Sequence, residues 1–208
     1  MALWHDHLLP RLVDKACARP DFAGPRRRAL SGLRGDVVEI GFGSGHNLAY
    51  YPPGVDRVLA VEPSMTARRL AERCVAESGI TVEYVGIDGQ ALALSDESAD
   101  TAVSTFTLCT IPDVARALGE LARVLRPGGR LHFLEHGLSP DPKVAAWQHR
   151  LTPLQKRLVG GCHFDRPIAE LVAAAGFDIV ELENSYLPGP KTPSYLCRGV
   201  AEPHVLSR

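Results

Sequence analysis

The chain contains 208 residues, of which 45% are hydrophobic, and its 23 basic and 24 acidic residues leave a formal net charge of −1. This length is enough to bury one sizeable core and too short for two ordinary catalytic domains, so we expect a single domain over residues 1–208. The near-neutral charge excludes a long-range field that would gather nucleic acid or an anionic membrane, and it favours a small-molecule substrate.

The first 34 residues are predicted to form a helical cap. Their apolar residues recur on one helical face, at Leu3, Leu8, Leu12 and Val13. Pro10 must kink or restart that helix, and the basic run 26–28 is predicted to be a solvated face. Two interpretations of the helix stay open, a packing or oligomer contact and a lid over the substrate. With no apolar run long enough for a signal peptide or a membrane span, we expect a cytoplasmic protein without a membrane span.

A buried-looking strand then runs into three glycines at alternate positions. Residues 37–40 read Val-Val-Glu-Ile and suit a central parallel strand, and Gly41, Gly43 and Gly45 follow. Glycine lets the backbone adopt positive φ and approach a ligand closely. A dinucleotide fingerprint would place its third glycine three residues after the second, where this chain has His46, so a nicotinamide cofactor is disfavoured.

An acidic residue follows about 20 positions after the glycines. In a nucleotide-binding αβ unit, an acidic residue at this place accepts hydrogen bonds from the ribose hydroxyls. Glu62 closes the apolar run 58–61, which places it at the carboxyl end of the second strand. Together with Glu39, which precedes the alternate glycines, it resembles the class I S-adenosylmethionine-dependent methyltransferases. The resemblance implies S-adenosyl-L-methionine as cofactor and an α/β fold: a Rossmann-like sandwich whose mostly parallel seven-stranded sheet carries helices on both faces.

The same resemblance extends the cofactor site along the chain. Met65 begins a helix predicted over 63–78 with Ser64 as N-cap, and it would lie on the adenine, although ordinary packing is an equal alternative. Asp88 follows a strand predicted over 81–87 and is similar to the acid that accepts a hydrogen bond from the adenine amine; the alternative is a simple turn. The predicted cofactor-binding residues are Glu39, Gly41, Gly43, Gly45, Asn47, Glu62, Met65, Asp88, Gly89 and Thr105.

The second half of the chain supplies the rest of the sheet. A strand over 100–107 is expected to end where this family meets the methyl group, and Asp113 caps a periodic helix that ends at 127–129. The sequence Leu-Arg-Pro-Gly-Gly before the strand 130–135 is typical of the family. Residues 136–164 have weak periodicity and are predicted to be an insertion near the substrate pocket. A helix capped by Asp165 and strands over 177–182 and 195–201 complete the fold.

A narrower resemblance is to the animal thiol S-methyltransferases and their bacterial relatives, which carry a methyltransferase type 11 domain. The shared stretches are Glu-Ile-Gly-Phe-Gly-Ser-Gly leading into Tyr-Pro-Pro-Gly, Leu-Glu-His at 134–136, Trp147-Gln148, Gly161-Cys162-His163 and Gly199-Val200-Ala201. They imply a small thiol as methyl acceptor, in a largely apolar pocket lined by Phe106, Cys109, Trp147 and Cys162. The sequence shows no hydrophobic N-terminal anchor like that of the animal proteins, which weakens the expectation of lipophilic substrates.

His136, directly after Glu135 at a strand end, is the candidate catalytic residue, with a solvent-facing loop histidine as the alternative. Metal binding by His136, His149 and Cys162 is not expected, because none of the usual ligand spacings occurs. Two other functions remain open. They are methylation of oxygen or nitrogen on a small metabolite, and cofactor binding without turnover.

Overall fold

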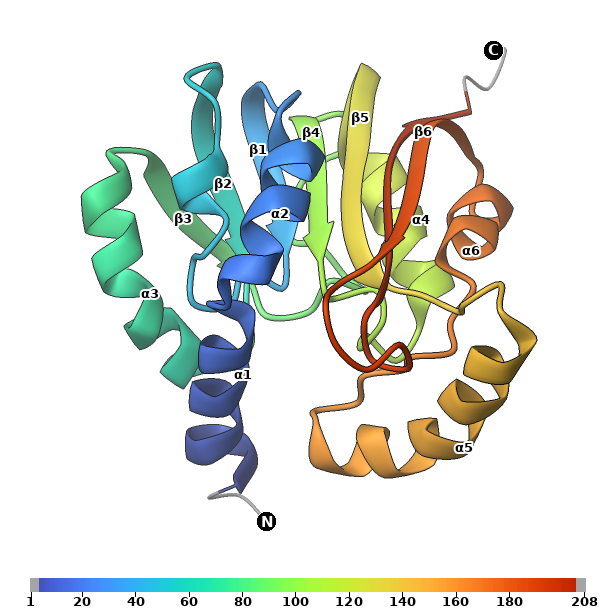
Figure 1. Ribbon diagram of the computed structural model, residues 1–208. Coiled ribbons are helices and arrows are strands. Elements are labelled where there is room, and N and C mark those ends of the chain that lie inside the picture. The colour runs from blue at the N-terminus through green and yellow to red at the C-terminus, as the bar shows by residue number, and fades with distance from the viewer. Residues whose placement is uncertain (1–3, 205–208) are drawn as a thin grey trace.

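Seven strands form one sheet in residues 4–204, the part of the chain that the computed structural model describes: β1 (Gly35–Ile40), β2 (Val55–Val61), β3 (Thr81–Gly86), β4 (Ala99–Thr105), β5 (Leu125–His136), β6 (Phe177–Tyr186) and β7 (Tyr195–Pro203). Their order is β3-β2-β1-β4-β5-β7-β6 (Figure 1). The first five strands pair in parallel, whereas β7 runs antiparallel to β5 and β6. The predicted, mostly parallel seven-stranded sheet is therefore confirmed.

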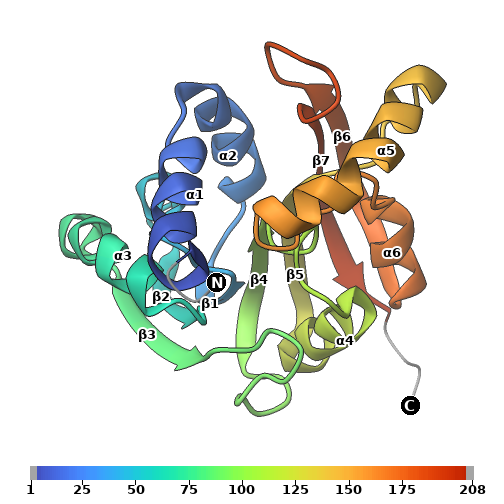
Figure 2. The same cartoon turned by 90° about the horizontal axis from the view of Figure 1, so that it is seen from below.

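Helices lie on both faces of this sheet, as predicted. The α-helices are α1 (Leu9–Cys17), α2 (Ala23–Leu30), α3 (Met65–Ser78), α4 (Val114–Val124), α5 (Pro142–Leu158) and α6 (Ile168–Ala174). Shorter turns precede or connect them: a π-helix η1 (Trp4–Leu8) and the 3₁₀ turns η2 (Pro20–Phe22) and η3 (Leu48–Tyr50). The view from below shows α2 and α4 on opposite sides of the sheet (Figure 2).

The two faces of the sheet bury separate apolar layers. Side chains alternate along a strand, so Val38 and Ile40 point to the face that α4 and α6 cover, while Val37 points to the face under α2 and α3. All three are fully buried. This double burial explains why β1 reads as a continuous apolar run rather than an alternating one.

The helix starts predicted from capping residues are confirmed at α3 and α4. Ser64 Oγ accepts from the Ala67 amide at 3.2 Å, and Asp113 Oδ1 accepts from the Arg116 amide at 3.0 Å. The predicted end of α4 at 127–129 is wrong. The helix ends at Val124 and the chain enters β5 at once, where the pairing with β4 jumps from Leu125 to Arg130 across the Pro-Gly-Gly segment.

Residues 136–164 contain a 17-residue helix, α5, which the weak periodicity concealed. Its buried residues Val144, Gln148 and Thr152 recur every fourth position, but two of them are polar. Its large apolar side chains are instead exposed, at Trp147, Leu151, Leu154 and Leu158. The prediction that Asp165 caps α6 is wrong, since α6 begins at Ile168 after Pro167 and Asp165 pairs with His149.

The N-terminal helix packs differently from its predicted apolar face. Leu9 is buried, whereas Leu8 and Leu12 are about half exposed, and Leu3 lies outside the described residues. Pro10 stands in the first turn of α1, directly after the π-helix η1, so the helical pattern restarts as an α-helix next to the proline. In residues 4–204, no helix has the length and hydropathy that crossing a membrane requires.

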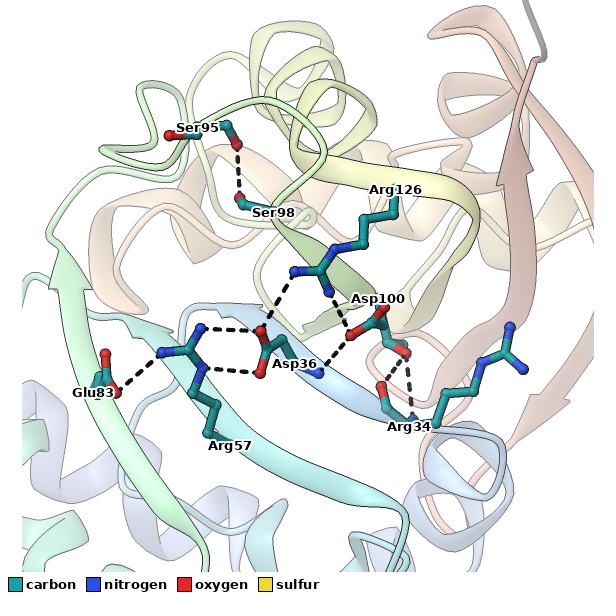
Figure 3. A network of polar contacts seen from close by, with 9 residues as sticks. Arg34, Asp36, Arg57, Glu83, Ser95, Ser98, Asp100 and Arg126 are labelled. Carbon is teal, nitrogen blue, oxygen red and sulfur yellow. Dashed lines mark hydrogen bonds and ion pairs between the residues drawn. The ribbon is translucent and has the colours of Figure 1, made fainter.

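Charged side chains link the amino ends of the central strands (Figure 3). Arg57 donates to both oxygens of Asp36 at 2.9 and 3.0 Å, and Arg126 donates to Asp100 at 2.6 Å. Asp100 also accepts from the Asp36 amide at 2.9 Å. This network holds the starts of β1, β2 and β4 together at the edge opposite the candidate site.

Candidate active site

The predicted site residues gather at the carboxyl edge of the sheet. Because β1, β2, β4 and β5 run in one direction, their carboxyl ends meet there, and the loops that follow them lie side by side. In open α/β sheets this edge is where ligands bind. The predicted cofactor residues stand at the ends of β1 and β4, in the loops after β1, β2 and β3, and at the start of α3. Of the predicted acceptor residues, Phe106 and Cys109 lie in the loop after β4, and Cys162 follows α5.

The three alternate glycines have different structural roles. A Cβ at Gly41 would lie 1.9 Å from Thr107 Oγ1, and one at Gly45 would lie 3.2 Å from the Cys74 Cβ. Packing against neighbouring side chains therefore requires glycine at both positions. A Cβ at Gly43 would meet only the Gly41 carbonyl oxygen, at 3.8 Å. All three have positive φ, from 59° to 77°. Gly43 alone therefore faces space that a ligand can use.

Glu39 is the centre of a buried polar network under the glycine loop. Its Oε1 accepts from Asn47 Nδ2 at 2.6 Å, and its other oxygen accepts from the Tyr51 hydroxyl. Asn47 also donates to Thr105 Oγ1 at 2.8 Å, which joins three of the predicted cofactor residues. Burial raises the pKa of Glu39 to about 7. The network fixes the end of β1 against the end of β4.

Sequence reasoning missed one member of this network, Arg26. It was expected on a solvated face, but it is only 4% exposed, and its Nε donates to Asn47 Oδ1 at 3.1 Å. Its guanidinium also donates to the Cys17 carbonyl at 2.6 Å and lies over the Phe22 and Phe106 rings. Nothing in the basic run distinguishes Arg26 from its neighbours. The contact depends on how α2 crosses the sheet edge.

Glu62 connects the glycine loop to the start of α3. One carboxylate oxygen accepts from the Gly43 amide at 2.8 Å and the other from the Ser64 amide at 2.7 Å. The side chain is 6% exposed, and burial raises its pKa. A carboxylate has about four lone-pair directions, so two acceptor positions remain for a ligand's hydroxyl groups.

The remaining predicted cofactor residues lie toward β3. Met65 is 59% exposed at the first position of α3. Asp88 is exposed, and its Oδ1 accepts from the Gln90 amide at 2.8 Å and from the Gln90 side chain at 2.9 Å, which lowers its pKa. Gly89 is a packing position, because a Cβ there would lie 3.1 Å from Ile111. Asp88 thus forms the simple turn that the sequence allowed as an alternative to adenine binding. It also lies at the same edge of the sheet as Glu62.

A second group at this edge brings three soft donor atoms together. The Cys109 and Cys162 sulfurs are 3.7 Å apart, and His136 Nδ1 lies 3.8 Å from the first and 3.6 Å from the second. We call Cys109, His136 and Cys162 the sulfur–histidine cluster. The Phe106 and Phe164 rings flank His136, with centroids 5.0 and 5.5 Å from the imidazole. Three of the four predicted acceptor residues and the candidate catalytic histidine therefore meet.

The backbone around Cys109 is held from two sides. Buried Glu135, adjacent to His136, accepts from the amides of Thr107, Leu108 and Cys109 at 3.0–3.1 Å. The Cys109 carbonyl accepts from the His163 amide at 2.7 Å. Gly160 and Gly161, both at positive φ, turn the chain after α5 so that Cys162 reaches the cluster. The non-glycine residue Phe106 also has positive φ, at 56°, a costly conformation that concentrates at functional sites.

The structure does not bring Trp147 to the sulfur–histidine cluster. Its side chain is 52% exposed on α5, and the Arg150 guanidinium lies over its ring. The α5 face that packs inward carries Gln148 instead, so the place of Trp147 in the substrate pocket stays a prediction without a contact to the cluster. Gln148 accepts from the Ser139 amide and donates to the Gly137 carbonyl, which are structural contacts. His149 pairs with Asp165 at 3.0 Å and is likewise outside the cluster.

A cavity of about 250 Å³ lies between the N-terminal helices and α3. Its lining contains Arg26, His46 and Cys74, but Gly45 is the single predicted cofactor residue among them. Gly43, Glu62 and Thr105 do not contact it. The position of a cofactor is therefore better indicated by the glycine loop and the carboxylates than by this cavity.

Comparison with known proteins agrees with this geometry. A family model described as a methyltransferase domain matches residues 38–133. The thiol S-methyltransferase TMT1B of Rattus norvegicus is 34% identical over 161 residues, which are 74% of this chain and 65% of that protein. The human thiol S-methyltransferase TMT1A is 31% identical over 81% of this chain and 68% of its own length. The chain thus spans about two thirds of the length of these relatives.

Other relatives act on other acceptors. A phosphatidylethanolamine N-methyltransferase of Cereibacter sphaeroides is 30% identical over 76% of this chain and 78% of its own length. Among solved structures, an S-adenosylmethionine-dependent methyltransferase of Methanosarcina mazei has a TM-score of 0.65 at 23% identity, covering 82% of this chain and 93% of its own. At that identity the structural likeness shows the fold alone.

Proposed function

The chain belongs to the class I S-adenosylmethionine-dependent methyltransferases, and from that membership we propose that it transfers a methyl group to a small thiol. The observation that carries the thiol assignment is the sulfur–histidine cluster at the acceptor end of the site. Identity to the rat and human thiol S-methyltransferases supports the same assignment. A nitrogen acceptor is the alternative, favoured by the identity to the phosphatidylethanolamine enzyme.

The residues of this chain fit the family's cofactor, which is S-adenosyl-L-methionine. The open approach over Gly43 suits a ligand that lies on the glycine loop, and the free acceptor positions of Glu62 suit two ribose hydroxyls. We propose that Asp88 and Met65 hold the adenine from the β3 side. The Glu39–Asn47–Thr105 network would then line the end of the cofactor site that lies nearest the methyl acceptor.

The bound cofactor supplies an activated methyl group on a sulfonium sulfur, together with a good leaving group. The protein's own task is to hold the acceptor in line with that methyl and to exclude water. Phe106 and Phe164 provide an apolar surface for this purpose beside His136. We propose His136 as the catalytic residue that keeps the acceptor sulfur in its thiolate form, the nucleophilic form of a thiol.

We also propose that residues 1–34 and 136–164 act as a cap and as a pocket wall around this single domain. Polar contacts connect the N-terminal part to the glycine loop and to the start of α3: His46 pairs with Asp14 at 2.8 Å, Thr66 donates to the Asp6 carbonyl at 2.6 Å, and Arg26 donates to Asn47. Cys162 belongs to the second segment and completes the sulfur–histidine cluster. These contacts support both proposed roles.

The test is cofactor turnover against matched acceptors. The full-length protein is supplied with S-adenosylmethionine and with 2-mercaptoethanol, ethanolamine or ethylene glycol, which differ in one nucleophilic atom, and with a panel of larger thiols. Release of S-adenosylhomocysteine with thiols supports the proposal. Turnover with amines or hydroxyls and none with any thiol overturns it, and cofactor binding without turnover on any acceptor would identify a binding module.

A further inference from the structure

The sulfur–histidine cluster has the dimensions of a metal site. A tetrahedral zinc ion with Zn–S bonds of about 2.3 Å and Zn–N bonds of about 2.0–2.1 Å sets its ligand atoms about 3.8 Å apart for two sulfurs and about 3.6 Å apart for sulfur and nitrogen. The corresponding separations here are 3.7 Å between the sulfurs and 3.8 and 3.6 Å from sulfur to Nδ1. Each lies within about 0.2 Å of the expected value, the tolerance that a metal site demands.

The donor types also suit zinc. Two cysteine sulfurs and one imidazole nitrogen match a soft, borderline ion, and carboxylates, which hard cations prefer, are not among the three donors. Two cysteines and one histidine are a ligand set that catalytic zinc sites use, with the fourth position left for substrate. Sequence spacing could not reveal this set, since its members come from the loop after β4, the end of β5 and the turn after α5.

The fold prepares the three ligands and leaves one side accessible. Glu135 and the His163 amide fix the backbone on both sides of Cys109, and Thr110 Oγ1 lies 3.6 Å from its sulfur. Cys109 and Cys162 are buried, whereas His136 and Phe106 are only partly buried. The more exposed side of the cluster is thus that of His136 and Phe106, and we infer that a fourth ligand approaches from there.

We propose that Cys109, Cys162 and His136 hold a zinc ion whose fourth position binds the acceptor sulfur. This inference rests on the proposed thiol methylation and assigns His136 the role of a ligand through Nδ1. The acceptor thiol loses its proton to solvent as it coordinates, because a metal-bound thiol is deprotonated. The acceptor sulfur then forms a bond to the methyl carbon as the carbon–sulfonium bond breaks. The electron pair of that bond stays on the sulfur of S-adenosylhomocysteine, and the neutral thioether product leaves the metal.

Metal binding is tested on full-length protein kept in a phosphine reductant, so that no added thiol competes. After chelation and dialysis, titration with Co²⁺ should give one ion per chain and a thiolate-to-cobalt charge-transfer absorption, which Zn²⁺ should displace. Cys162→Ser and His136→Gln should each weaken Co²⁺ binding at least about tenfold. Removing an outer-shell partner of a metal ligand already costs about that much, and removing the ligand itself should cost more. Cys74→Ser is the matched control and should bind like the wild type.

The absence of thiolate-to-cobalt absorption in folded wild-type protein, with folding checked by circular dichroism, would overturn the metal site. So would wild-type affinity in a folded Cys162→Ser or Cys109→Ala variant. Three ligand variants, Cys109→Ala, His136→Gln and Cys162→Ser, are specified because any one of them could fail to fold. Weakened cobalt binding in those that keep the wild-type circular dichroism spectrum supports the site.

The open position is tested on the cobalt-loaded protein. Adding 2-mercaptoethanol should shift the cobalt spectrum, whereas ethylene glycol, its oxygen counterpart, should not. An unchanged spectrum with every thiol would mean a closed structural site and would overturn the catalytic part of the proposal.

Turnover separates this inference from the proposed function. Chelation should lower thiol methylation at least about tenfold, and Zn²⁺ should restore it. Full thiol methylation by metal-free protein would remove the zinc site and leave the proposed function intact. Metal binding with a thiol-sensitive spectrum, but no methylation of any thiol, would remove the proposed function and leave the metal site.

Discussion

At the carboxyl edge of the sheet, two buried carboxylates each accept several hydrogen bonds from the protein. Glu62 accepts from two backbone amides in different loops, and Glu135 accepts from three consecutive amides and from Ser104. Each carboxylate therefore shapes a loop at the carboxyl edge of the sheet. Substitutions at these positions have to be chosen so that ligand binding and loop structure are measured separately.

Glu62→Gln should weaken cofactor binding by about tenfold to 100-fold, because hydrogen bonds to a charged carboxylate contribute about 1.5–3 kcal/mol. Glutamine retains an acceptor oxygen for only one of the two amides that Glu62 binds, so folding of the variant is checked by circular dichroism. Isothermal titration calorimetry with S-adenosylhomocysteine measures the effect, and Glu72→Gln, an exposed position on α3, is the control. Unchanged affinity in the folded variant would exclude Glu62 from the cofactor site.

Gly43 and Gly41 should respond differently to alanine. Both have positive φ, which strains alanine, so either substitution should lower the melting temperature. A Cβ at Gly43 meets no clash within the protein, so Gly43→Ala should still fold and should lose most cofactor binding. A Cβ at Gly41 would lie 1.9 Å from Thr107 Oγ1, so Gly41→Ala should destabilise the fold itself. Thermal unfolding with and without S-adenosylhomocysteine distinguishes the two effects. Normal ligand-induced stabilisation in Gly43→Ala would contradict the assignment.

At the scale of elements, much of the fold could be predicted because local rules and tertiary packing agree. The glycine loop, the buried strand before it and the caps at Ser64 and Asp113 all follow from short-range chemistry. The helix α5 could not be predicted, since its inward face is partly polar and its outward face is apolar. The contact of Arg26 and the meeting of Cys109 with Cys162 depend on long-range packing, which no local pattern encodes.

The charged network at the amino ends of the strands predicts a pH-dependent contribution to stability. Hydrogen bonds from Arg57 lower the pKa of Asp36 below its ordinary value of 3.8. Because the carboxylate is favoured in the folded state, its stabilisation is fully present above about pH 3.8 and disappears as the pH falls through the lowered pKa. Asp36→Asn should therefore lower the melting temperature at pH 7, and the difference from wild type should shrink below pH 4.

Thermal unfolding followed by circular dichroism from pH 3 to pH 8 measures this difference. Glu202→Gln is the matched control, because the Glu202–Arg130 pair is more exposed and such pairs contribute little. An Asp36→Asn difference that stays constant over the whole pH range would show that the lost ion pairs are not its source.

At the scale of the molecule, the candidate site combines the N-terminal helices and the segment after β5 with the carboxyl edge of the sheet. The N-terminal helices reach the glycine loop through Asp14 and Arg26, and the segment after β5 returns Cys162 to the loop after β4. The candidate cofactor residues could be named from the sequence because their motif is local, and their role remains a proposal. The candidate acceptor residues could also be named, but their arrangement depends on the fold.

The proposed cap makes one prediction about motion that involves the whole chain. If the N-terminal helices close over the cofactor, amides of Leu9–Cys17 can exchange only after the cap opens, so bound S-adenosylhomocysteine should slow their hydrogen exchange. Exchange in α6, on the other side of the sheet, should slow less. Asp14→Asn, which weakens the contact with His46, should reduce the protection of α1 while the glycine loop stays protected. Hydrogen-exchange mass spectrometry measures all three segments together. Protection of the glycine loop with no change in α1 would mean that the helices are a fixed packing element and that the acceptor enters without any opening of the cap.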